Sequence, residues 1–219
     1  MVEYKRSVVV VEDDSFLRSL IADAIEAAGF SVSTAPNAAD ARRVINAIDP
    51  DAVVLDIDLG NGLTGFDIAD SIRSQSEDTS IVFLTALPDP RFAGRENNAV
   101  YKNAAYLNKH LLEDTDTLIA ALEAVLTERS ISAFRHHEDE NRPLAHLSRT
   151  QIQVLQLLAE GKTNQQIADA RKRSLAATES AITRTLEALQ IESSADINVR
   201  VVAAREYMTS VGTHSRERT

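Results

Sequence analysis

Short apolar runs alternate with amphipathic stretches through the first half of the chain. Five runs are short enough to be buried strands, at residues 7–12, 30–34, 51–56, 80–85 and 104–108. Between them, apolar residues spaced three and four apart predict helices, at residues 14–28, 37–49, 65–75 and 114–128. The stretch 90–101 contains Pro90 and Gly94 and is the weakest candidate for a helix. The alternation predicts an α/β fold with a flavodoxin-like (βα)5 doubly wound parallel sheet.

The second half of the chain has only helical periodicity. Ser148 and Thr163 each stand three residues before a glutamine, in the pattern of a capping box, and Ser174 is expected to cap the next helix. Four helices are expected, at residues 149–160, 164–171, 175–189 and 195–209. Residues 129–146 are polar and without periodicity, and so predict a linker. The expected division is a first domain, a linker, an all-α domain and a tail, at residues 1–128, 129–146, 147–211 and 212–219.

Composition narrows the possible functions. The chain has 219 residues and no cysteine, which excludes disulfides, thiol catalysis and cysteine-based zinc sites. No apolar run approaches the ~18 residues that span a membrane, and the N-terminus lacks the apolar core of a signal peptide. We therefore expect a soluble, cytoplasmic protein without a membrane partner. The adjacent His136 and His137 suggest metal binding, but a solvated charged tract is the favoured reading.

The net charge of −10 is unevenly distributed. Residues 1–129 contain 22 acidic and 11 basic residues, net −11, whereas residues 147–219 contain 8 acidic and 10 basic residues, net +2. The difference suggests different partners for the two halves. The alternative, that the acidic residues only solvate the helices of the first domain, stays open.

Chemically active side chains stand at the ends of the predicted strands. Glu12 ends the first strand and Asp13 follows it, Asp56 ends the third, Thr85 ends the fourth and Lys109 follows the fifth. In a parallel sheet these ends meet at one edge, which is where such sheets bind ligands. Carboxylates, a hydroxyl and a lysine at one edge make a site for Mg²⁺ and a phosphoryl group.

These residues, in this order and spacing, resemble the receiver domain of response regulators over roughly residues 5–128. The resemblance implies that Asp56 is the phosphoacceptor and that Asp13 binds Mg²⁺ directly, with Glu12 acting beside it through water. The backbone carbonyl of Asp58 would be a third protein ligand of the metal. Thr85 would hydrogen-bond the transferred phosphoryl group and Lys109 would pair with it. The resemblance also implies that a sensor histidine kinase is the partner. It further implies that this chain is a regulatory protein and not an enzyme.

Two positions of the receiver pattern leave alternatives open. Tyr106 would be the aromatic residue that turns inward on activation, but it could also be an ordinary aromatic at the sheet edge. The segment Pro88-Asp-Pro-Arg91 after Thr85 is unusual for the family, and the loop is about two residues longer than the family pattern. We therefore expect an atypical signalling face.

The helical half resembles a LuxR/NarL helix-turn-helix domain. The resemblance rests on Leu147-Ser148, Val154-Leu155, Leu157-Leu-Ala-Glu-Gly161 and Thr163-Asn-Gln-Gln-Ile-Ala168. It implies a scaffold helix at 164–171 and a recognition helix at 175–189 that enters the major groove. The residues expected at the DNA are Thr163, Arg171, Lys172, Arg173, Glu179, Ser180, Thr183 and Arg184.

The recognition region departs from the family pattern. Arg171-Lys172-Arg173 replaces the usual Leu-Gly-Ile turn, and Glu179 stands where a lysine commonly meets DNA. Glu179 would repel phosphate, although it could accept a hydrogen bond from cytosine. The basic turn could equally be only a solvated bend.

The two resemblances together predict a two-component response regulator that is phosphorylated on Asp56 and regulates transcription by binding double-stranded DNA. The alternative is a phosphorylation-controlled protein-interaction switch whose divergent helix-turn-helix no longer binds DNA specifically. The last helix, with Ile197, Val201, Val202 and Ala204 on its apolar side, would support a homodimer or pack within its own domain.

Overall fold

The computed structural model describes residues 5–60, 62–76, 78–142, 144–191 and 198–212. The chain forms two compact units. The first unit consists of Met1–Ala86 and Asn98–Asp139, and the helical unit consists of Leu87–Asn97 and Glu140–Thr219. The chain therefore crosses between the units three times, after Ala86, Asn97 and Asp139.

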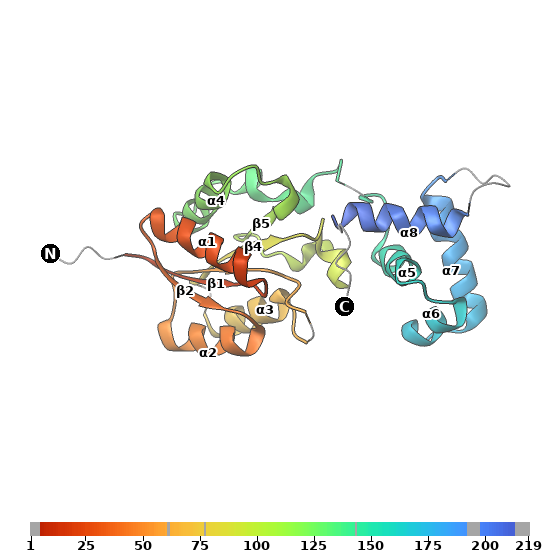
Figure 1. The fold of residues 1–219 in the computed structure, drawn as a ribbon, viewed down its shortest axis with the longest axis horizontal. Coiled ribbons are helices and arrows are strands. Elements are labelled where there is room, and N and C mark those ends of the chain that lie inside the picture. The colour runs from red at the N-terminus through yellow and green to blue at the C-terminus, as the bar shows by residue number, and fades with distance from the viewer. Residues whose placement is uncertain (1–4, 61, 77, 143, 192–197, 213–219) are drawn as a thin grey trace. The chain divides into compact units, whose positions relative to one another are not determined.

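The first unit is built on a parallel five-stranded sheet (Figure 1). Its strands are β1 Ser7–Val11, β2 Ser31–Ala35, β3 Ala52–Leu55, β4 Ser80–Thr85 and β5 Ala105–Asn108. The strand order is β2-β1-β3-β4-β5, and all four pairings are parallel. This is the flavodoxin-like order, which confirms the predicted fold.

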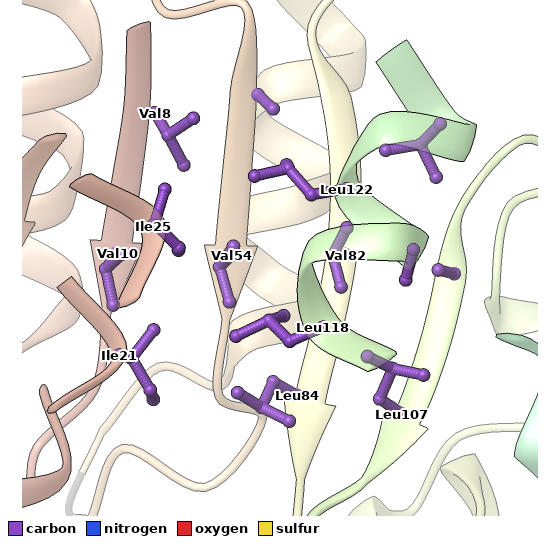
Figure 2. Close-up of a cluster of buried hydrophobic side chains, with 14 residues drawn as sticks. Val8, Val10, Ile21, Ile25, Val54, Val82, Leu84, Leu107, Leu118 and Leu122 are labelled. Atoms are coloured by element: carbon purple, nitrogen blue, oxygen red, sulfur yellow. The ribbon is translucent and has the colours of Figure 1, made fainter. Parts of the chain in front are cut away.

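Helices cover both faces of this sheet, with α1 and α4 on one face and α2 and α3 on the other (Figure 1). Their bounds are α1 Ser15–Ala27, α2 Ala38–Ile48, α3 Gly65–Gln75 and α4 Asp116–Leu126. Figure 2 shows the core on the first of these faces, where Ile21 and Ile25 of α1 and Leu118 and Leu122 of α4 meet the strand valines. Because both faces are covered, the inner strands β1, β3 and β4 are mostly apolar and buried, whereas the edge strand β2 is more polar and exposed.

The weak helical segment at residues 90–101 contains only two short 3₁₀ helices, η1 Pro90–Ala93 and η2 Asn97–Ala99. The Asp89 side chain accepts a hydrogen bond from the amide of Arg91, and Pro90 occupies the first turn of η1. Gly94, with φ of +72°, ends η1 in a left-handed conformation. Thus no α-helix joins β4 to β5 among the described residues.

The residues predicted as a linker, 129–146, do not form an independent connector. Residues 130–139 belong to the first unit, where η4 Ser132–Phe134 and η5 His136–Glu138 pack against β5. The Arg135 guanidinium donates to the carbonyl of Ala104 at 2.9 Å, and the amide of Asn108 donates to Nδ1 of His136 at 3.1 Å. These contacts use backbone groups at the sheet edge, which sequence periodicity does not reveal.

The helical unit contains α5 Arg149–Ala159, α6 Asn164–Arg171, α7 Leu175–Ala188 and α8 Val199–Ser210. Ser148, Thr163 and Ser174 cap the first three, as predicted, and the first two form capping boxes. Among the described helices, none combines the length and apolar character that a membrane crossing requires.

Val201, on the predicted apolar side of α8, is 62% exposed and so does not pack within its own domain. The buried residues of the helix are Ala203 and Ser210. Of the two alternatives for this side, the homodimer contact stays a prediction. Ile197 lies outside the described residues.

Candidate functional site

Three carboxylates gather at the carboxyl edge of the sheet. Glu12 and Asp13 follow β1 and Asp56 follows β3, and one oxygen from each lies within 4.8 Å of the others. Glu12 and Asp56 are buried, at 2% and 6% exposure, whereas Asp13 is exposed. The parallel pairing of β1 with β3 brings these strand ends together, as the sequence predicts.

Lysine 109 and threonine 85 complete the cluster from the next two strands. The Lys109 Nζ atom lies 2.6 Å from Oε2 of Glu12 and 2.7 Å from Oδ2 of Asp56. The Thr85 hydroxyl donates a hydrogen bond to the Asp56 carboxylate. The Asp58 amide also donates to Oδ1 of Asp56, at 3.2 Å. The structure therefore brings together all the strand-end residues predicted for this site.

The cluster holds more negative than positive charge. Burial raises the pKa of Asp56, although Lys109 and the hydrogen bonds oppose this rise. Burial and the charge of Asp56 likewise raise the pKa of Glu12. Burial acts to lower the pKa of Lys109, but the charges of Asp56 and Glu12 outweigh it and raise that pKa. A further cation at the carboxylates would relieve this excess of negative charge.

Local backbone structure fixes which acidic residues reach the site. The Asp14 side chain caps α1 by accepting from the amides of Phe16 and Leu17, so it is used away from the cluster. The Arg18 guanidinium donates to the carbonyl of Glu12 at 2.7 Å. These contacts agree with the expected choice of Glu12 and Asp13 over Asp14.

Gly65 holds the start of α3 against the backbone of Asp56. Its amide donates to the carbonyl of Ile57 at 3.0 Å. A Cβ atom at this position would overlap the carbonyl oxygen of Asp56. Glycine is therefore required here by close approach of two backbone segments.

Tyr106 is fully buried in β5. Its ring centroid lies 4.9 Å from that of His137 and 6.2 Å from that of Phe83. The ring already points inward, so the predicted swing would not begin from an exposed ring in this structure. Sequence periodicity does not indicate that His137 packs on Tyr106, because the contact joins residues 31 positions apart.

The three carboxylates form an acidic pocket typical of the receiver magnesium site. Mg²⁺ prefers hard oxygen ligands, and carboxylates with their excess negative charge supply them. The donor set therefore fits the predicted metal. Among the described residues, no other group of acidic or histidine side chains comes together in this way.

A second polar surface lies on the helical unit around α6, α7 and the turn between them. Thr163 caps α6, and Lys172 forms the turn with φ of +52°. Thr178 of α7 is fully buried, which sets the register of the helix and leaves the predicted DNA-facing residues exposed, namely Glu179, Ser180, Thr183 and Arg184. Lys172 and Arg173 are exposed as well.

Arg171 differs from its neighbours because part of its guanidinium is buried. Its Nε and Nη1 atoms have no hydrogen-bond partner among the described residues. Burial and the charges of Arg173 and Arg184 lower its pKa. An anion near the turn would reduce the repulsion among these cations. The sequence indicated basic character at this turn but not that one of its cations is partly buried.

Comparison with known proteins assigns both halves to families. The family described as a response regulator receiver domain matches residues 8–123, and the family of bacterial regulatory proteins, luxR family, matches residues 145–200. A relative from Pseudomonas aeruginosa, described as a transcriptional regulator, is 31% identical over 171 residues, covering 74% of this chain and 80% of its own. BvgA of Bordetella pertussis is 28% identical over 200 residues, covering 87% of this chain and 93% of its own.

A solved structure resembles the chain over most of its length. RcsB from Salmonella enterica serovar Typhimurium, bound to a promoter in the presence of phosphomimetic BeF3−, has a TM-score of 0.61 and 20% identity. The match covers 94% of this chain and all of that chain. At this identity the likeness shows a shared fold, which agrees with the two family matches.

Proposed function

Because the chain belongs to the response regulators that carry a receiver domain and a LuxR-type DNA-binding domain, we propose that phosphorylation of Asp56 by a sensor histidine kinase controls DNA binding by the helical unit. One observation carries the first half of this proposal. Lys109 lies within 2.7 Å of both Asp56 and Glu12, at the edge where a phosphoryl group would enter. Both matched families are regulators and not enzymes.

In the proposed step, an Asp56 carboxylate oxygen forms a bond to the phosphorus of the donor. The bond from phosphorus to the donor imidazole nitrogen breaks, and its electron pair leaves with the imidazole, which takes up a proton. Glu12, Asp13, Asp56 and the backbone carbonyl of Asp58 would hold Mg²⁺. When bound, this ion neutralises charge that develops on the phosphoryl oxygens.

After transfer, the chain's own residues stabilise the product. Lys109 would pair with the phosphoryl oxygens, because it already lies against the acceptor carboxylate. The Thr85 hydroxyl would move its hydrogen bond from the carboxylate to the phosphoryl group. The charge of the phosphoryl group, sensed by Thr85, would shift an existing equilibrium between inactive and active forms. Tyr106 would be part of this switch.

The helical unit supplies the proposed DNA contacts. The exposed Glu179, Ser180 and Thr183 would face base edges, while Thr163, Lys172, Arg173 and Arg184 would serve the phosphate backbone. Arg171 would add a further positive charge for the phosphate backbone at this turn. We include a homodimer in the active state, matching two half-sites, and we place both steps in the cytoplasm.

The direct test is a pull-down of sheared genomic DNA by the full chain, with and without beryllofluoride and Mg²⁺, at about 0.15 M salt. Discrete enriched sites that sharpen with beryllofluoride are expected. Asp56→Asn is the matched control and should give the same sites in both conditions. Failure of the wild-type protein to bind beryllofluoride would overturn the phosphoryl step.

The second candidate is a protein-interaction switch, and the exposed Glu179 favours it. A carboxylate at the start of the recognition helix opposes phosphate. Glu179→Lys should then raise DNA affinity. The slope of log K against log salt concentration should become steeper by about one or two, because counterion release rises with each added cation. Absence of enriched sites for both the wild type and Glu179→Lys would favour this second function.

A further inference from the structure

The segment after β4 leaves the first unit almost at once. Thr85 is the last residue of β4, and Leu87 already belongs to the helical unit. We name residues 87–97 the anchor segment. By sequence it lies within the receiver match, which runs from 8 to 123, yet it packs as part of the DNA-binding half.

A buried ion pair holds the anchor segment in place. Asp89 is fully buried and Arg91 is 6% exposed. The guanidinium of Arg91 binds the carboxylate in a bidentate manner, with Nε 2.9 Å from Oδ1 and Nη2 2.6 Å from Oδ2. Arg142 adds a third bond, from its Nε to Oδ2 at 2.8 Å. A carboxylate with two guanidinium partners is well compensated for its burial.

Arg91 also reaches the backbone that leads into α5. It donates to the carbonyls of Leu144, Ala145 and Leu147, the first two at 3.2 and 3.1 Å. At the far end of the anchor segment, Arg149 donates to the carbonyl of Gly94 at 3.0 Å. Movement of the anchor segment would therefore displace the start of α5.

Phe92 joins the anchor segment to the core of the helical unit. Its side chain is 5% exposed and packs in one cluster with Leu147, Ile152 and Leu155. Its ring stacks on Tyr207 of α8 at 5.6 Å between centroids and an interplanar angle of 27°. The helical unit is therefore discontinuous in sequence, because part of its core comes from between two receiver strands.

We propose that the anchor segment transmits the state of the phosphoryl site to the helical unit through the backbone from Thr85 to Leu87. This inference rests on the proposed phosphorylation of Asp56. Only Ala86 separates the two residues, so the connection can extend by no more than ~7 Å. A displacement of Thr85 toward a phosphoryl group then has no long flexible linker in which to be absorbed, and it repositions the start of α5 and its packing on α8.

The test relaxes this connection and leaves every anchor contact intact. In the first variant, Gly-Ser-Gly-Ser is inserted between Ala86 and Leu87 of the full chain. The matched control carries the same insertion between Asp139 and Glu140, which is also a crossing between the units. Amide hydrogen exchange of each protein is measured by mass spectrometry, with and without beryllofluoride and Mg²⁺.

In the wild type, beryllofluoride should slow exchange around residues 56–60 and change exchange across residues 144–159 by roughly fivefold or more. The insertion after Ala86 should keep the first effect and reduce the second below about twofold. The control insertion should keep both effects. A full response at 144–159 in the first variant, or an equal loss in the control, would overturn the coupling.

Two further outcomes are separable. If the wild type shows no change at residues 56–60, the phosphoryl proposal itself fails. If it changes there but not at 144–159, the phosphoryl site stands and the coupling is wrong. Should the first insertion unfold the helical unit, Ala86→Gly loosens the same backbone without lengthening it. That variant should retain wild-type exchange in the absence of beryllofluoride and show a smaller response with it; an unchanged response would count against the coupling.

Discussion

The two units each contain a buried cluster of charges, and the two clusters are built in opposite ways. In the first unit, Lys109 alone faces the buried carboxylates of Glu12 and Asp56, and the pKa of both acids is raised, chiefly by burial. In the helical unit, Asp89 alone faces two guanidiniums. Burial again acts to raise its pKa, but the bonds from Arg91 and Arg142 outweigh this and lower it.

The difference shows what each cluster is suited to do. The first has an excess of negative charge, so it gains from a cation and from a group that removes charge on the acids. The second has one carboxylate between two guanidiniums, and Arg91 also donates to three backbone carbonyls, so its polar groups are paired within the fold and it serves packing. We call the first the unbalanced cluster and the second the paired cluster.

The largest effect is expected from removing the acid of the paired cluster. Asp89→Asn leaves Arg91 and Arg142 buried without a counter-charge, and we expect the free energy of unfolding of the helical unit to fall by about 3–5 kcal/mol. The measurement is urea denaturation followed by segment-resolved hydrogen exchange. Glu96→Gln is the control, because the Glu96–Arg149 pair is exposed and should matter by less than about 1 kcal/mol. Equal effects of the two substitutions would contradict this account.

In the unbalanced cluster, the position of Asp56 depends on the close backbone contact with Gly65. Gly65→Ala pushes a methyl group into the Asp56 carbonyl, and we expect a loss of stability of about 1–3 kcal/mol in the first unit. Beryllofluoride binding should weaken as well, because Asp56 moves. Ser71→Ala, farther along α3, is the control and should leave binding unchanged. Retention of wild-type binding by Gly65→Ala would show that the backbone contact does not position Asp56.

Removing an acid from the unbalanced cluster should have the opposite sign. Asp56→Asn removes a buried carboxylate whose pKa is raised, so the free energy of unfolding of the first unit at neutral pH should rise by about 1 kcal/mol. Acetyl phosphate should no longer label the protein at this position. Chemical denaturation in the absence of Mg²⁺ tests the stability change, and a decrease would show that Lys109 already balances the cluster.

Acid pH should change the relative stability of the two units by a smaller amount. The folded-state pKa of Asp89 lies below the ordinary 3.8, so its contribution to stability is present above pH 3.8 and is lost as the pH falls through the folded value. The raised pKa values of Glu12 and Asp56 have the reverse sign, since their contribution is lost as the pH rises. As the pH falls from about 6 to 3, the helical unit should therefore lose stability relative to the first unit, as measured by urea denaturation. Asp89→Asn should remove the part of that relative loss that comes from the helical unit and leave the part that comes from Glu12 and Asp56.

The sequence predicts the regular parts of both units. The strand ends at Glu12, Asp56, Thr85 and Lys109 follow from apolar runs followed by polar residues, because strand period and parallel pairing are local rules. The helix starts at Ser148, Thr163 and Ser174 follow from capping, which involves residues three apart. Their positions needed no knowledge of tertiary contacts.

Long-range pairing explains what the sequence did not predict. His137 covers Tyr106, and Arg142 reaches Asp89, across 31 and 53 residues respectively. Each lies in a polar tract without periodicity, which is the pattern of a solvated linker. Pro88-Asp-Pro-Arg91 was visible as an irregular, unusual segment. Nothing in that pattern indicates that Asp89 and Arg91 are buried, since the partners that compensate them lie elsewhere in the chain.

The interleaving of the two units limits how this regulator can be recombined. A gene fusion that joins residues 1–128 to a foreign output domain would keep Phe92 and lose the apolar cluster that covers it. The reciprocal fusion, beginning at residue 140, would expose Leu147 and Tyr207 and leave Arg142 without Asp89. In this protein the helical half cannot be excised as one continuous stretch, because Phe92 of its core lies between two strands of the first unit.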